Sequence, residues 1–254
     1  MAYFGVGGSG IAAALLRPLL PEQSRVRLLN GLRLSSGELK ECDFLVFISY
    51  SGNSEEVVEA YRRLKPAPSA AVCISSGGTL LAEARLNGTP RIVLEPGHLP
   101  RFALPDLLGS VYGLIEAFGM AKSGYLASTS QALEKWLPRI EESARSLAEK
   151  VSSAGYDRFI VGAFSGYEAL ARRWAGQICE NAKIEAEAVV LPESFHNLIV
   201  PLCEGVTKNP PAVFILRDPD APQSHLEGRW TRAFQKTLLK FGRDRCEVLK
   251  PPRI

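Results

Sequence analysis

Residues 43–64 read DFLVFISYSGNSEEVVEAYRRL. After its aspartate the segment 43–49 is apolar, which is typical of a strand covered on both faces of a parallel sheet. Residues 54–64 have the pattern of an amphipathic helix, with Ser54 as its N-cap, acids in the first turn and basic residues in the last. A buried strand followed by such a helix is half of a βαβ unit, so this stretch predicts an α/β fold with a doubly wound parallel sheet.

The same alternation continues on both sides of this stretch. Further strands and helices are expected at residues 2–6, 8–19, 26–30, 70–75, 79–86 and 91–95. A helical region over 106–153, with a polar break at 127–130, comes next, and the pattern restarts with the apolar segment RFIVGAF at 158–164. The restart predicts two related α/β halves, which we divide as residues 1–125 and 126–254.

Composition excludes several classes of protein. Thirty Lys and Arg against 27 Asp and Glu give a net charge of +3, and no basic run is interleaved with aromatic residues, so we expect neither nucleic acid nor a membrane surface as a partner. No apolar run approaches the ~20 residues that cross a bilayer. The five cysteines form no CxxC pair and the histidines lie apart from them, which predicts reduced thiols, a cytoplasmic protein and no metal site.

A glycine-rich turn follows the first expected strand. Residues 5–10 read GVGGSG and lead into a helix. Glycine permits a tight turn, and the free amides at a helix start attract an anion. Gly8 and Ser9 are therefore predicted to contact a phosphate group.

A serine-rich turn follows the third expected strand. Ser49, Ser51 and Ser54 lie within SYSGNSEE at 49–56, where a glycine and an asparagine permit the bend. Hydroxyls and helix amides can surround a phosphate without a lysine. In an open parallel sheet this turn lies at the carboxyl edge, where ligands bind. We predict that these three serines bind the same phosphate as Ser9.

Two alternatives remain open for these turns. Gly5, Gly7 and Gly10 satisfy the GxGxxG dinucleotide fingerprint, but that site also needs an acid near the end of the second strand, where the sequence has Leu29 followed by Asn30. The serines can also be explained as helix caps and turn formers without any ligand.

The motif SYSGNSEEV resembles the phosphate-binding signature of sugar isomerase (SIS) domains. More narrowly, the chain is similar to archaeal-type bifunctional phosphoglucose/phosphomannose isomerases over PRFALP at 100–105 and over ICENAKIEAEAVVLPESFHNLIV at 178–200. The resemblance implies two flavodoxin-like SIS halves. It also implies a cofactor-free aldose–ketose isomerase that converts glucose 6-phosphate or mannose 6-phosphate to fructose 6-phosphate through a cis-enediolate.

The resemblance also assigns three catalytic residues. Glu180 is the base that moves the proton, Arg101 stabilises the enediolate charge, and His196, in a loop, assists ring opening from the partner subunit of a homodimer. Each has a plainer explanation: Glu180 can pair with Lys183 at a helix end, and the other two can be solvated loop residues.

The family carries a further catalytic lysine on a helix near its carboxyl terminus and a helical segment before the first glycine turn. We expect this chain to lack both, and Lys250, which two prolines follow, is no substitute. The second hypothesis is therefore a non-catalytic phosphosugar-binding protein on the same fold.

Overall fold

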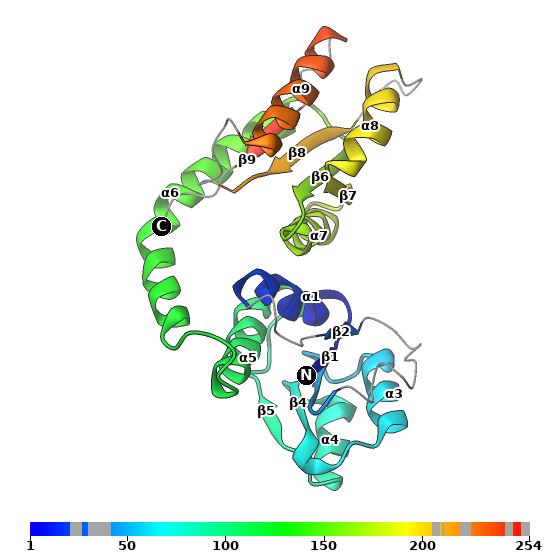
Figure 1. Cartoon of the computed structure of the whole chain (residues 1–254), viewed down its shortest axis with the longest axis vertical. Coiled ribbons are helices and arrows are strands. Elements are labelled where there is room, and N and C mark those ends of the chain that lie inside the picture. Colours follow the sequence, from blue (N-terminus) through cyan, green and yellow to red (C-terminus); the bar gives the residue numbers. More distant parts are fainter. Residues whose placement is uncertain are drawn as a thin grey trace. The chain divides into compact units, whose positions relative to one another are not determined.

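The computed structural model describes residues 1–20, 27–29, 42–204, 209, 211–218, 225–241 and 246–249. The chain divides into two units, Met1–Leu126 and Ala127–Ile254. Each unit has a parallel sheet with helices on both faces, which confirms the predicted α/β class (Figure 1).

The sheet of the first unit has the strand order β2-β1-β3-β4-β5, and every neighbouring pair is parallel. This is the flavodoxin-like order, in which the direction of strand addition reverses between β1 and β3. The carboxyl ends of these two adjacent strands flank the position where ligands bind in such sheets. The strands are β1 (Ala2–Phe4), β2 (Arg27–Leu29), β3 (Leu45–Ile48), β4 (Ala71–Ser75) and β5 (Arg91–Val93).

Helices cover both faces of this sheet because alternate strand residues point to opposite sides. Val46 and Ile48 pack under α1 and α5, whereas Phe4 and Phe47 pack under α3 and α4. The two phenylalanine rings stack with centroids 4.9 Å apart. The helices are α1 (Gly7–Leu16), α3 (Glu55–Leu64), α4 (Gly78–Leu86) and α5 (Leu104–Ala117).

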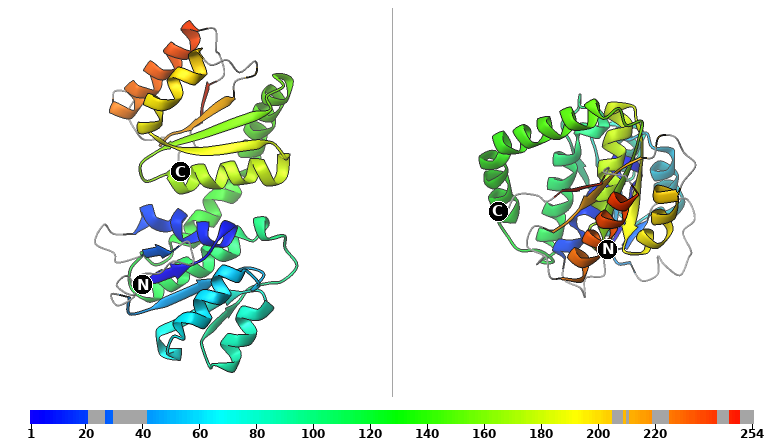
Figure 2. Two further views of the ribbon diagram at one scale, coloured as in Figure 1. Left: turned by 90° about the vertical axis from the view of Figure 1, so that its right-hand side faces the viewer. Right: turned by 90° about the horizontal axis from the view of Figure 1, so that it is seen from above.

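The second unit has the strand order β7-β6-β8-β9, again parallel throughout. One face packs against α7 and the end of α6, and the other packs against α8 and α9 (Figure 2). If the strands of each unit are numbered from its own first strand, both sheets begin with the order 2-1-3-4. The elements are α6 (Tyr125–Ser153), β6 (Arg158–Phe164), α7 (Glu168–Gln177), β7 (Glu185–Leu191), α8 (Glu193–Glu204), β8 (Ala212–Leu216), α9 (Leu226–Lys240) and β9 (Cys246–Leu249).

The predicted helix break at 127–130 is wrong. Those residues lie in the first turns of α6, and the break lies between Ala117 and Tyr125 instead. Gly119 and Gly124 adopt left-handed backbone angles there, with φ of 68° and 77°. A glycine in this conformation ends a helix more effectively than a run of Ser and Thr, which tolerate helical positions.

Two further observations concern the cysteines and the possibility of a membrane-spanning helix. All five cysteines lie among the described residues, and none of them forms a disulfide. None of the described helices combines the length and the apolar character needed to span a membrane.

The core of the first unit gives a stability prediction. Phe47 is fully buried in the central strand β3, so Phe47→Ala should reduce the free energy of unfolding by about 3–5 kcal/mol. Leu86→Ala is the matched control, because Leu86 is 85% exposed and its loss should cost less than about 0.5 kcal/mol. Urea denaturation measures both. Equal destabilisation by the two variants would contradict this packing.

Candidate functional site

The glycine-rich and serine-rich turns meet at the carboxyl edge of β1 and β3. The backbone amide of Tyr50 donates a hydrogen bond of 3.0 Å to the Ser9 hydroxyl oxygen, which joins the two turns directly. Ser9 is buried, with 8% of its surface exposed. Gly8 lies beside it in the first turn of α1 and is partly exposed. The two predicted phosphate-binding turns are therefore brought together.

The three serines after β3 differ in environment. Ser49 is fully buried and its hydroxyl lies 2.9 Å from that of Ser54, whose backbone amide also reaches the Ser49 oxygen at 3.4 Å. Ser51 is exposed, and its hydroxyl accepts a bond of 3.3 Å from the amide of Asn53. Ser49 thus shapes the turn from inside, while Ser51 presents its hydroxyl proton to the surroundings.

The starts of the two helices at this edge are open to an anion. Ser54 occupies the N-cap position of α3 and Val6 that of α1, yet at neither of these two described helix starts does a side chain cap the amides. First-turn amides generally lack a partner within their own helix, although in α3 the Val57 amide bonds to the Ser54 carbonyl oxygen. The Ser54 hydroxyl bonds to Ser49 instead of acting as an ordinary cap, so capping does not explain the serine cluster.

The turn after β4 packs directly on the serine-rich turn. The carbonyl oxygen of Tyr50 accepts bonds from the hydroxyls of Ser75 and Ser76 at 3.1 and 2.6 Å, and from the Ser76 amide at 2.8 Å. Gly52 has a left-handed backbone with φ of +70°, and a Cβ there would lie 1.9 Å from the Gly77 carbonyl oxygen. The close approach of these two main chains therefore requires glycine at position 52.

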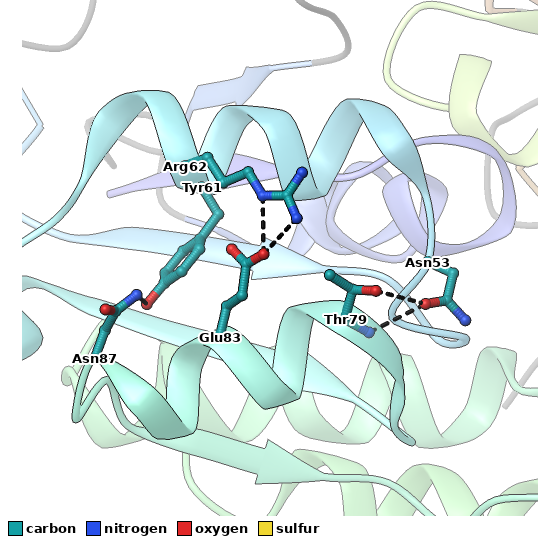
Figure 3. Close-up of polar contacts among 6 residues, drawn as sticks. All are labelled: Asn53, Tyr61, Arg62, Thr79, Glu83 and Asn87. Carbon is teal, nitrogen blue, oxygen red and sulfur yellow. Dashed lines mark hydrogen bonds and ion pairs between the residues drawn. The ribbon is translucent and has the colours of Figure 1, made fainter.

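Side-chain bonds extend this attachment along the helices α3 and α4 (Figure 3). The Asn53 side-chain oxygen accepts from the amide and the hydroxyl of Thr79 at 3.1 and 3.2 Å. Midway along, Arg62 donates to Glu83. At the far end, the Tyr61 hydroxyl bonds to Thr89 and Asn87. The cradle of residues 49–54 is thus held by a helix pair that is fixed at both ends.

Arg101 belongs to the same edge of the first sheet. It lies in a short 3₁₀ helix (Pro100–Phe102) that follows β5, so the prediction of an irregular loop is corrected to one helical turn. Its guanidinium carbon lies 5.1 Å from the ring centroid of Phe102. Four neighbouring strands of this sheet therefore end at one edge. Ser9 follows β1, the cradle follows β3, Ser76 follows β4 and the Arg101 segment follows β5.

Glu180 lies in the second unit, in a single π-helical turn (Ile178–Ala182) after α7, where it is exposed. Lys183 donates a bond of 2.6 Å to its backbone carbonyl oxygen. Burial lowers the pKa of the Arg173 guanidinium, and the negative charge of the nearby Glu180 opposes that shift. A basic side chain therefore lies near Glu180.

His196 lies on α8, and the expected loop is wrong. Phe195, the preceding residue, packs against Phe234 with ring centroids 4.5 Å apart. Because neighbouring helical residues point in different directions, this anchoring leaves His196 and Asn197 exposed. The helix was hard to predict because Pro201 lies inside it.

The second sheet separates Glu180 from His196. Glu180 precedes β7, and His196 follows it. A strand of seven residues spans roughly 20 Å, so the two residues of one chain lie at opposite edges of this sheet. The structure brings Gly8, Ser9 and the cradle serines together, but it does not bring Glu180 and His196 of one chain together.

Sequence reasoning missed two residues. Arg173 is seven positions before Glu180, a spacing that places both on one side of a helical segment. This spacing could have identified Arg173 as a neighbour of Glu180 from the sequence. Tyr50, inside the SYSGN motif, links the surrounding turns, and no sequence signal distinguishes it from an ordinary core tyrosine.

The described residues contain no cluster of His, Cys, Asp and Glu able to hold a metal ion. For the dinucleotide alternative, Leu29 ends β2 without an acid, while Asn30 and Gly31 lie outside the described residues, as does Lys250.

The chain is similar in sequence to known sugar-phosphate isomerases. Residues 140–251 match the family described as bacterial phospho-glucose isomerase C-terminal SIS domain. A bifunctional phosphoglucose/phosphomannose isomerase of Caldicellulosiruptor bescii is 31% identical over 205 residues, which cover 77% of this chain and 60% of the relative. That of Aquifex aeolicus is 30% identical over 79% of this chain and 61% of the relative. The chain thus spans about three fifths of the length of these relatives.

Solved structures agree on the fold. A hypothetical protein from Thermus thermophilus superimposes with a TM-score of 0.73 at 16% identity, over 99% of this chain and 72% of that one. The fold and the family match together define a protein of the sugar isomerase (SIS) superfamily. Within it, the chain is similar to the bifunctional phosphoglucose/phosphomannose isomerases over 77–79% of its length.

The contact between the two turns gives the next prediction. Gly52→Ala should destabilise the protein by clearly more than Gly88→Ala, although both residues have φ near +70°. The left-handed backbone alone costs about 1–2 kcal/mol for a residue with a Cβ, and around Gly88 the added atom has free space. Differential scanning calorimetry compares the two. Similar losses would mean that the turns after β3 and β4 separate easily.

Proposed function

We propose that this chain takes part in the isomerisation of hexose 6-phosphates, converting glucose 6-phosphate or mannose 6-phosphate to fructose 6-phosphate. One observation carries the proposal: hydroxyls and uncapped helix amides converge where β1 and β3 end. Such a site suits a phosphate dianion, which helix starts and serine hydroxyls bind without a cofactor. The names of the relatives support the sugar phosphate as the substrate class.

The chemistry assigns one role to each catalytic candidate. Glu180 removes the C2 proton of the open-chain aldose and returns it to C1. Arg101 stabilises the negative oxygen of the cis-enediolate that forms between these steps, and His196 transfers the proton needed to open the sugar ring. The positive charge of Arg173 lies near Glu180, and the exposure of His196 leaves its imidazole accessible.

The active form is proposed to be a homodimer with a shared site. Glu180 and His196 of one chain lie at opposite ends of β7, so a second copy must supply one of them to a common substrate. Five cysteines without a disulfide among them support a reducing compartment, the cytoplasm, as the place of action.

The cradle is tested by Ser51→Ala. A hydrogen bond to a charged group contributes about 1.5–3 kcal/mol, so the Kd for fructose 6-phosphate should rise roughly 10- to 100-fold. The melting temperature should stay unchanged because Ser51 is exposed. Ser153→Ala, an exposed serine at the end of α6, is the control. Isothermal titration calorimetry measures both, and unaltered affinity in Ser51→Ala would refute the cradle.

The base is tested by Glu180→Gln in a coupled assay that converts glucose 6-phosphate to fructose 6-phosphate without added metal or nucleotide. Loss of a general base should lower kcat by about 10²–10⁴-fold, while the Kd for fructose 6-phosphate changes less than about threefold. Glu142→Gln, on the exposed face of α6, should retain full activity. Binding without any turnover in the unaltered protein would favour the non-catalytic phosphosugar-binding alternative.

A further inference from the structure

The segment that carries Arg101 is anchored at both ends. Leu94 is buried and its amide donates 2.9 Å to the Ser75 carbonyl oxygen, while Ala103 is fully buried at the start of α5. Residues 95–102 between these anchors are exposed, apart from the half-buried Arg101. Gly97 adds conformational freedom, with φ of +103°. Contacts in the middle of the segment therefore bear on the position of Arg101.

One buried hydroxyl holds that middle. The Tyr50 hydroxyl donates 2.8 Å to the backbone oxygen of Glu95 and accepts 2.9 Å from the backbone amide of His98. Both capacities of the phenol are used, on two backbone groups three residues apart, and Tyr50 itself is only 4% exposed. Two residues after His98, the 3₁₀ helix with Arg101 begins.

The main chain of the same tyrosine belongs to the phosphate cradle. Its amide donates to Ser9, and its carbonyl oxygen accepts from Ser75 and Ser76. Tyr50 thus touches the turn after β1, the turn after β4 and the segment after β5, while it stands in the turn after β3.

We infer that Tyr50 is a positioning residue that fixes the Arg101 segment relative to the phosphate cradle. For catalysis the inference rests on the proposed function: the serines hold the phosphate, and the Tyr50 hydroxyl sets where Arg101 stands along the sugar attached to it. A misplaced cation stabilises the developing oxyanion poorly, although substrate binding through the phosphate is unaffected.

Tyr50→Phe separates this role from a general structural one. The ring stays in the core beside Val46 and Ile48, and the main-chain bonds to the cradle remain. Glu95 and His98 are exposed, so water can satisfy their freed backbone groups and the variant should fold. The change therefore releases the segment and leaves the cradle in place.

Hydrogen exchange on the ligand-free protein tests the inference directly. In Tyr50→Phe the amides of His98, Phe102 and Ala103 should exchange about tenfold faster or more, because the 3₁₀ turn whose bonds protect the last two is no longer held. Faster exchange at His98 alone, or at none of the three, overturns the proposal. This result does not depend on any activity of the chain.

The matched control is Tyr61→Phe. Tyr61 is also a buried tyrosine of the first unit whose hydroxyl has two partners, Thr89 and Asn87, but these lie at the far end of α3. Exchange at residues 98–103 should stay as in the unaltered protein. If Tyr61→Phe accelerates exchange there to the same extent, the effect is general loosening and the positioning role fails.

Steady-state kinetics distinguish a positioning role from a purely structural one, because only the former changes kcat without changing KM. Tyr50→Phe should lower kcat for glucose 6-phosphate about tenfold or more with KM within about twofold, whereas Tyr61→Phe should change neither. A rise in KM with kcat preserved contradicts the inference, because it would place the defect in the cradle. An unaltered protein without turnover sinks the proposed function, and the exchange experiment then still decides the role of Tyr50.

Discussion

The turns after β3 and β4 approach so closely that their main chains leave no room for a Cβ at residue 52. This contact determines the rest of the candidate site. It brings the Tyr50 carbonyl within reach of two serine hydroxyls and sets the start of α4 against the cradle, where Gly78 also has a left-handed backbone. Glycine at these positions is thus a geometric requirement of the joint between the turns.

In an anion site, a rigid arrangement of hydrogen-bond donors favours ligand binding. The hydroxyl of Ser9 accepts one bond from a backbone amide and that of Ser51 does the same, so each can still donate its proton to a ligand. Donors that are oriented before the ligand arrives need no reordering when it binds, and ordering is a large part of the cost of association. The internal bonds of the cradle therefore favour phosphate binding rather than competing with it.

The sequence predicted the parts of the fold that depend on local patterns. Continuous apolar strands, the helix at 54–64 and the restart at residue 158 were all readable because burial on both faces and helical spacing leave clear periodicity. The break before α6 and the helical setting of His196 were not, because glycine conformation and tertiary packing decided them against local propensity. The serine motif was visible, whereas the links made by Tyr50 depend on segments 41 and 48 residues apart in the chain, which no local pattern contains.

The two units share a strand order but differ at the equivalent edge. After β6 the turn carries Gly166, whose amide donates 2.9 Å to the carboxylate of Glu168, and the hydroxyl of Tyr167 lies 3.3 Å from the carboxylate of Asp218 after β8. Here the Glu168 carboxylate accepts from an amide that lies before the start of α7, whereas the cradle of the first unit consists of hydroxyls and amides. The equivalent turn of the second unit therefore offers a different set of groups from the cradle. Its candidates for the reaction, Glu180 and His196, lie at opposite ends of β7, and only His196 follows a strand at the carboxyl edge. The proposed proton transfers therefore need groups from both ends of that strand.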